Sequence, residues 1–221
     1  MSNTMMQIVS RAPIIPVLSV ARPEYAEPLA IALRDGGLPV LEVTLRTSAA
    51  LEAIDVIRQR VDGVCVGAGT LLNAHDVKRA RAAGSEFLVT PGATEALIAC
   101  CADSDLPYMP GVATATEAIR CLEQGIDLVK FFPAEAMGGA KVLQALAGPL
   151  PMMRFCPTGG VSLDNMADYL ALPSVACMGG SWIAPPALQA EENWPAIRER
   201  ATVAAKRAQT LRASMGVNGE Q

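Results

Sequence analysis

The chain has 221 residues, a length that one α/β barrel can fill, and 51% of its residues are hydrophobic while 18% are charged. This composition excludes a disordered chain and predicts a large core, which Ala, Val, Leu and Ile must fill because aromatic residues are only 4% of the sequence. The net charge of −4, with no basic block, argues against nucleic acid or an anionic membrane as a partner.

Short apolar runs, each followed by a helix-like stretch, recur along the chain at a step of about 23 residues, which is roughly what a strand, a turn and a helix need. The predicted strands are 14–20, 40–45, 64–67, 87–90, 108–110, 128–131, 154–156 and 175–178. The predicted helices are 23–34, 49–57 with Ser48 as a possible N-cap, 73–83, 116–124, 162–172 and the C-terminal 191–213. Residues 214–221 are expected to be a frayed tail.

Eight such steps without a change of rhythm predict a single-domain (β/α)8 TIM barrel over 1–221, with its core at about 12–186. The alternative is an open, doubly wound sheet. That fold should offer a glycine-rich dinucleotide turn after its first strand, whereas 14–20 is followed by Ala21, Arg22 and Pro23.

The six cysteines form no C-x-x-C pair and predict reduced thiols rather than a disulfide framework or a zinc site. The only histidine, His75, lies in the polar start of a predicted helix, where we expect it to face solvent. The N-terminus has no signal-peptide pattern, and the uncharged stretch 169–190 is interrupted by Pro and Gly. A cytoplasmic protein is expected.

Polar residues interrupt the predicted strand 40–45. Barrel strands are covered on both faces, so polar side chains within them need a reason. Alternation places Glu42, Thr44 and Arg46 on one face, which points into the barrel if the leucines and valine meet the helices. An edge strand with a solvated face is the alternative, but a closed barrel has no edges.

A lysine, Lys130, lies in the middle of the apolar strand 128–131, whereas Lys78, Lys141 and Lys206 lie on polar stretches of predicted helices. Lysine is almost never buried without a partner or a purpose, and burial favours the uncharged, nucleophilic amine. An inward lysine and an inward Glu42 suit Schiff-base chemistry, in which an amine attacks a carbonyl and a carboxyl group moves protons. A purely structural Lys130–Glu42 ion pair remains the alternative.

Glycines cluster where the predicted strands end. Gly159-Gly160 and Gly179-Gly180 follow the last two strands, the places where such barrels often hold a phosphate on backbone N–H groups. Small residues also follow the third, fourth and fifth strands, at 67–70, 90–92 and 110–111. Together they predict that the protein binds a phosphorylated substrate through its backbone and needs no basic patch to do so.

Five segments in order resemble the class I 2-dehydro-3-deoxy-6-phosphogluconate (KDPG) and 4-hydroxy-2-oxoglutarate (KHG) aldolases, over residues 12–185. They are Leu-Glu-Val-Thr-Leu-Arg (41–46), Gly-Ala-Gly-Thr (67–70), Lys-Phe-Phe-Pro-Ala-Glu (130–135), Cys-Pro-Thr-Gly-Gly-Val (156–161) and Gly-Gly-Ser-Trp (179–182). The resemblance implies a (β/α)8 barrel, usually a homotrimer, that needs no metal or organic cofactor and serves carbohydrate metabolism in the Entner–Doudoroff pathway.

The resemblance also assigns roles to residues. Lys130 falls on the Schiff-base lysine and Glu42 on the proton-shuttling carboxylate, and Arg46 and Thr70 fall on positions that hold the pyruvate carboxylate. The other matching positions are Pro91 and Phe132, which line the pocket, and Thr158, Gly159, Gly160, Gly180 and Ser181, which hold the substrate's distal end and its phosphate.

The expected reaction is cleavage of a 2-keto-4-hydroxy acid: KDPG to pyruvate and glyceraldehyde 3-phosphate, and KHG to pyruvate and glyoxylate. Two alternatives remain open. One is a relative that acts on the 6-phosphogalactonate-derived substrate, and the other is a non-catalytic barrel that binds phosphorylated sugars.

Overall fold

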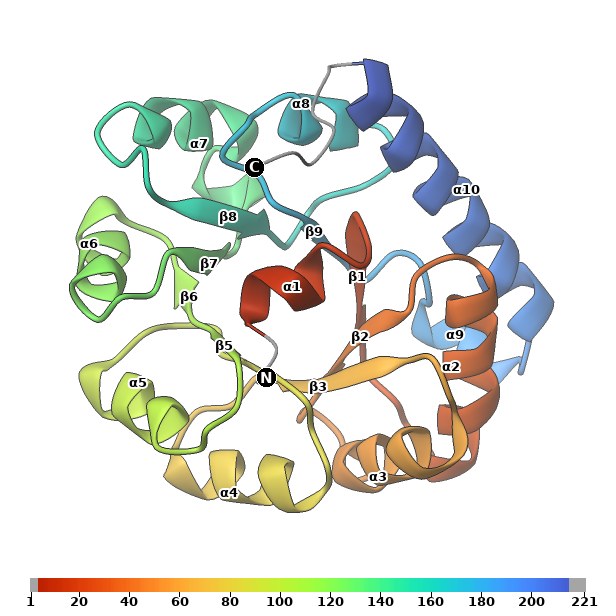
Figure 1. Cartoon of the computed structure of the whole chain (residues 1–221). Coiled ribbons are helices and arrows are strands. Elements are labelled where there is room, and N and C mark those ends of the chain that lie inside the picture. The colour runs from red at the N-terminus through yellow and green to blue at the C-terminus, as the bar shows by residue number, and fades with distance from the viewer. Residues whose placement is uncertain (1–3, 215–221) are drawn as a thin grey trace.

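The computed structural model describes residues 4–214, and in it a ring of parallel strands is enclosed by helices (Figure 1). The strands are β1 (Ile14–Leu18), β2 (Val40–Thr44), β3 (Cys65–Gly69), β4 (Leu88–Val89), β5 (Tyr108–Met109), β6 (Gly111–Val112), β7 (Leu128–Phe131), β8 (Arg154–Pro157) and β9 (Met178–Gly180). One sheet has the order β5-β4-β3-β2-β1-β9 and the other β6-β7-β8. Parallel bridges from Phe155 to Val175 and from Thr158 to Gly179 close the ring. The predicted (β/α)8 barrel is confirmed, and the open sheet is wrong.

Helices surround the ring in chain order, and α10 packs against both α2 and α8. Their bounds are α1 (Met5–Val9), α2 (Ala26–Asp35), α3 (Ala50–Arg60), α4 (Ala74–Ala82), α5 (Glu95–Ala102), α6 (Ala115–Glu123), α7 (Gly139–Ala147), α8 (Met166–Leu170), α9 (Pro186–Ala190) and α10 (Trp194–Ser214), with 3-10 turns η1 (Pro23–Tyr25) and η2 (Glu135–Met137). Of the predicted tail, Ser214 ends α10, and 215–221 lie outside the described residues.

The sequence had predicted that the fifth barrel strand ends at Pro110. In the structure the strand is divided there and continues. Its first half, β5, pairs with β4, and its second half, β6, pairs with β7. Proline has no N–H to give to a ladder, but its carbonyl accepts a 2.8 Å hydrogen bond from the backbone N–H of Lys130. The division therefore costs no bond on the side that faces β7.

Two predicted strand ends are wrong. The glycines at these ends pair with a neighbouring strand and do not form a turn. Residues 67–69 belong to β3, paired with β2, and Gly179 and Gly180 belong to β9, paired with β1. Ser48 is not the N-cap of α3. That position is taken by Ala49, which makes no side-chain cap bond.

Helix α1 was not predicted. Its N-cap Thr4 and Gln7 form a capping box, and Met5, Ile8 and Val9 join the core. Figure 1 shows α1 across the middle of the ring. It borders a cavity with Tyr108 and Leu128, which begin their strands, so α1 covers the amino-terminal end of the barrel. The opposite end is left for a site.

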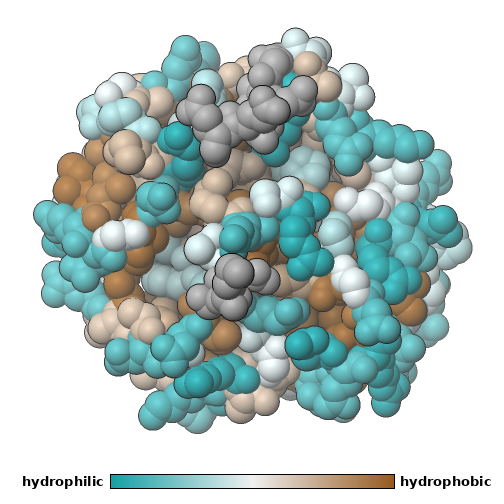
Figure 2. All heavy atoms as spheres, in the orientation of Figure 1, coloured by the Kyte–Doolittle hydropathy of each residue, from teal (hydrophilic) through white to brown (hydrophobic). Residues whose placement is uncertain are grey.

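None of the helices between residues 4 and 214 combines the length and the apolar character that a bilayer crossing requires. Figure 2 shows mainly hydrophilic residues on this face, with apolar surface at the left, where Figure 1 places α6.

Candidate active site

Lys130 and Glu42 meet inside the barrel. The Lys130 Nζ donates to Glu42 Oε1 at 2.8 Å and to Oε2 at 3.2 Å. The residues are only 5% and 1% exposed, whereas Lys78, Lys141 and Lys206 are all exposed. A buried pair of this kind must be held closely by its surroundings, since each charge alone would be costly to bury.

Glycine in β3 makes room for Glu42. The register sets Glu42 opposite Gly67 and Thr44 opposite Gly69. A side chain on Gly69 would overlap the Glu42 carboxylate, and one on Gly67 would overlap the ring of Phe87. The glycines at 67 and 69 are therefore required by packing within the strand.

The ring of Phe132 lies close to both Lys130 and the glycine turn that follows β8. Its centroid is 5.6 Å from Lys130 Nζ, within the range of a cation–π contact. A Cβ on Gly159 would be 3.4 Å from the same ring. Phe132 thus forms an apolar wall that links the amine to the turn.

Arg46 and Thr70 meet at the carboxyl ends of the neighbouring strands β2 and β3. Arg46 Nε donates to Thr70 Oγ1 at 3.3 Å. Thr70 has a φ of +62°, a left-handed conformation that is uncommon for threonine and is often held at functional sites. Arg46 is exposed, so a cation stands at the mouth of the barrel, where a carboxylate can reach it.

Pro91 lies at the rim after β4, half-buried. Its backbone presses so closely on Gly111 that a side chain there would overlap it. The hydroxyl of Thr90 supports this corner, because it donates to the Gly92 carbonyl at 2.7 Å and accepts from the Gly111 N–H at 3.3 Å. Pro91 is therefore held by β4 and β6 together.

The turn Thr158-Gly159-Gly160 has the form of an anion-binding nest. Gly159 and Gly160 have φ values of +97° and +81°. The carbonyls of Thr158 and Gly159 accept from the N–H groups of Ala134 and Glu135, at 2.8 and 3.0 Å. Within the described chain, the N–H groups of Gly160 and Val161 have no hydrogen-bond partner. Successive unpaired N–H groups of this kind suit a phosphate.

The second glycine segment stands beside the first, joined to it by the Thr158–Gly179 bridge. A side chain on Gly179 would overlap the buried hydroxyl of Thr158, and one on Gly180 would overlap the ring of Trp182. Ser181 follows at once and is exposed. The two segments therefore present their backbones at one side of the barrel mouth.

Some residues near the site were missed. Ser19, at the end of β1, lies 3.1 Å from the hydroxyl of Thr44, which donates to the Leu18 carbonyl at 2.8 Å. A serine at the end of an apolar strand was the available signal. Asn165 contacts the glycine turn from a later loop, and no local pattern marks it.

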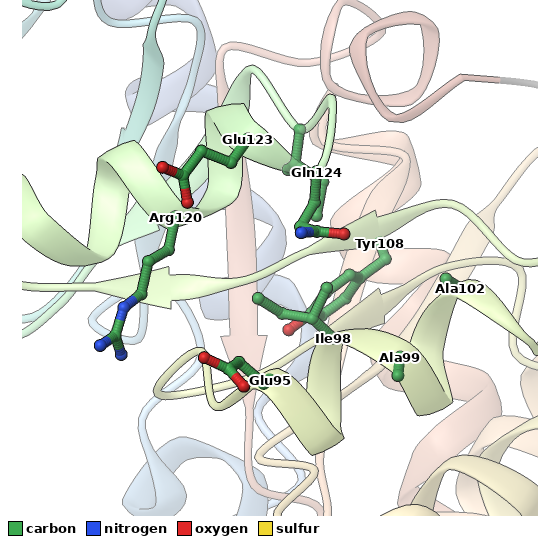
Figure 3. A pocket seen from close by; sticks show the side chains of 9 residues that line it. Glu95, Ile98, Ala99, Ala102, Tyr108, Arg120, Glu123 and Gln124 are labelled. Atoms are coloured by element: carbon green, nitrogen blue, oxygen red, sulfur yellow. The ribbon is translucent and has the colours of Figure 1, made fainter.

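A separate cavity of about 440 Å³ lies between α5 and α6, outside the ring of strands (Figure 3). Glu95, Arg120, Glu123 and Tyr108 line it, and the Tyr108 hydroxyl lies 3.0 Å from that of Thr90. It holds none of the predicted site residues. His75 is exposed, and within residues 4–214 no three His, Cys, Asp or Glu side chains gather as metal ligands would.

The model of the KDPG and KHG aldolase family matches residues 5–200. The 2-dehydro-3-deoxy-phosphogluconate aldolase of Dickeya dadantii (strain 3937) is 49% identical over 81% of this chain and 84% of its own length. The KHG/KDPG aldolase of Escherichia coli (strain K12) is 48% identical over 80% of this chain and 84% of its own.

A solved structure agrees with the fold. The KDPG aldolase of Legionella pneumophila is 39% identical, with a TM-score of 0.90 over 93% of this chain and all of that one. It was solved with pyruvate captured at low pH as a covalent carbinolamine intermediate.

Proposed function

The chain belongs to the KDPG and KHG aldolase family, and from this we propose that it cleaves KDPG to pyruvate and glyceraldehyde 3-phosphate, and KHG to pyruvate and glyoxylate. The observation that carries the proposal is the buried Lys130–Glu42 pair inside the barrel. The carbinolamine in the Legionella pneumophila relative supports a covalent route through a lysine amine.

The first step is imine formation. Transfer of one proton along the 2.8 Å hydrogen bond, from Lys130 to Glu42, leaves an uncharged amine beside a carboxylic acid. The amine attacks C2 of the keto acid, the carbonyl oxygen takes the proton of Glu42, and Glu42 takes one proton from the nitrogen, which gives the carbinolamine. Glu42 then supplies the proton with which that hydroxyl departs as water, which leaves a protonated imine.

The protonated imine is the electron sink for cleavage. Glu42, directly or through a water, takes the proton of the C4 hydroxyl. The C3–C4 bond breaks, its electron pair moves to the imine nitrogen, and the aldehyde leaves. The resulting enamine takes a proton at C3, and water releases pyruvate and regenerates the amine. This chemistry needs no metal or organic cofactor, so we expect full activity after dialysis against a chelator.

The remaining site residues bind the two ends of the substrate. We assign Arg46 and Thr70 to the carboxylate, because a cation beside a hydroxyl suits that group. Pro91 and Phe132 line the space between. The backbones of the distal segments hold the phosphate end: Thr158, Gly159, Gly160, Gly180 and Ser181.

The test is covalent trapping. Incubation with pyruvate and borohydride should add one reduced pyruvate to the protein, and the modified peptide should contain Lys130. Pyruvate release from KDPG, from its galactonate-derived epimer and from KHG ranks the substrates. Ligand binding with neither an adduct nor turnover would favour the non-catalytic barrel. A marked preference for the epimer would favour the alternative in which the enzyme acts on the 6-phosphogalactonate-derived substrate.

We also propose a homotrimer in the cytoplasm. The resemblance to the family supports the trimer, and exposed apolar side chains such as Ile119 and Met152 offer surface that association would cover. The six free cysteines support a reducing compartment. Light scattering of the purified protein tests the trimer, and a single-subunit mass would contradict it.

A further inference from the structure

The carboxamide of Asn165 bridges Gly160, in the glycine turn, and Ser162, just after it. Its Nδ2 donates to the Gly160 carbonyl at 3.0 Å, and its Oδ1 accepts from the Ser162 N–H at 2.8 Å. These two bonds fix the orientation of the amide, because a backbone N–H can only donate and a carbonyl can only accept.

Planarity of the peptide bond carries this constraint to the open side of the turn. A trans peptide points its C=O and the next N–H in opposite directions, so a fixed Gly160 carbonyl also fixes the N–H of Val161. Thr158 and Gly159 are held in the same way through Ala134 and Glu135. Each of the unpaired N–H groups is therefore aimed by an anchor on its far side. Of these anchors, only Asn165 is a side chain.

Glu135 is the second residue that packs against the turn, at Gly160. A side chain there would overlap Cβ and Cγ of Glu135, so the Glu135 stem lies directly against the turn. The carboxylate of Glu135 accepts a hydrogen bond from the hydroxyl of Tyr169, which is 1% exposed. Burial and then the Glu135 hydrogen bond raise the pKa of Tyr169, so the hydroxyl remains a donor.

We propose that Asn165 and the Glu135–Tyr169 pair are positioning residues, which hold the Gly159-Gly160 turn in its phosphate-binding form and so set the preference for phosphorylated over unphosphorylated 2-keto-4-hydroxy acids. This rests on the proposed function. Within the described chain, none of the three side chains hydrogen-bonds to Lys130 or Glu42, whose own bond joins β7 to β2. Their effect should therefore reach the phosphate end of the substrate and not the chemistry.

The experiment compares KDPG with its unphosphorylated parent, 2-dehydro-3-deoxygluconate. Asn165→Ala should lower kcat/KM for KDPG about fivefold to tenfold, mainly by raising KM, as the loss of one hydrogen bond implies. Tyr169→Phe should act in the same direction and serves if Asn165→Ala does not fold. For both variants, turnover of the parent and trapping of pyruvate should stay within about twofold of wild type.

Asp168→Asn is the matched control. Asp168 is exposed on α8 and lines the same surface groove as Glu135, Asn165 and Tyr169. Asp168→Asn should leave unchanged the ratio of kcat/KM for KDPG to kcat/KM for 2-dehydro-3-deoxygluconate. The inference would be overturned if the Asn165 and Tyr169 variants lost kcat/KM equally on both substrates, or lost none on KDPG. It would also be overturned if the wild-type enzyme had the same kcat/KM for KDPG and for its unphosphorylated parent. Failure of the wild type to trap pyruvate would instead overturn the proposed function.

Discussion

Lys130 Nζ reaches both carboxylate oxygens of Glu42, 88 positions away in the sequence, at 2.8 and 3.2 Å inside the barrel. Such a contact serves a structural ion pair and a catalytic pair equally well, since both need two buried groups in register. Covalent chemistry at the amine separates the two roles, because only a catalytic lysine forms an adduct with pyruvate.

Replacement of Lys130 by alanine should abolish the covalent adduct with pyruvate and lower kcat by about 10⁴-fold or more, because no other group in the site can form the imine. Mass spectrometry after borohydride reduction and a pyruvate-release assay measure the two effects. Lys78→Ala, at an exposed position on α4, is the control and should behave as wild type. Wild-type turnover by the Lys130 variant would rule out the mechanism.

Glu42→Gln should lower kcat by about 10²–10⁴-fold, the usual contribution of a general acid–base group. The amide cannot exchange protons with Lys130 or with the C4 hydroxyl, yet it keeps the length of the side chain. The pyruvate adduct should still form on Lys130, more slowly than in wild type. Single-turnover trapping gives its rate, and an unchanged rate would show that Glu42 only neutralises the lysine.

Gly69→Ala should displace Glu42, because the added Cβ would overlap its carboxylate. We expect a loss of about 1–3 kcal/mol in the free energy of unfolding, as for other overpacked sites, together with a fall in kcat. Urea unfolding and steady-state kinetics measure both. Gly148→Ala is the control, since the nearest atom to a Cβ there is 4.0 Å away. Normal kcat in Gly69→Ala would show that Glu42 tolerates displacement.

Glu117 should make stability depend on pH at the acid end. Burial raises the pKa of Glu117, but the N–H of Ala113, the hydroxyl and N–H of Thr114, and Arg120 together outweigh burial and hold it below the ordinary 4.5. The stabilisation is therefore complete above about pH 4.5 and is lost as the pH falls through the lower, folded-state pKa.

Glu117→Gln should consequently cost about 1 kcal/mol at pH 7, the usual size of a helix-cap interaction. The difference from wild type should shrink as the pH falls below 4.5. Urea unfolding at a series of pH values measures it. Glu123→Gln, exposed at the other end of α6, is the control. A difference that stays constant with pH would contradict the assignment.

The strand–helix rhythm predicted the barrel, because an apolar run of strand length recurred at each of the eight steps. The ends of β3 and β9, the strands that contain glycine, were harder to predict from the sequence. Glycine is favoured both in turns and beside bulky neighbours, and only the tertiary contact of Gly69 with Glu42 or of Gly179 with Thr158 tells the two apart. Helix α1 was missed for a related reason, because five residues carry too little periodicity to be recognised.

By itself, the sequence determined which residues carry unusual chemistry. A lysine and a glutamate inside apolar strands violate the burial pattern, and that violation is local. The tertiary structure decided which of those residues meet, and at what distance. It also revealed Asn165, Glu135 and Tyr169 behind the glycine turn, since asparagine, glutamate and tyrosine are ordinary in loops and short helices. Their significance comes from the closure of the ring, which brings β7, β8 and the segment before α8 to one side of the barrel mouth.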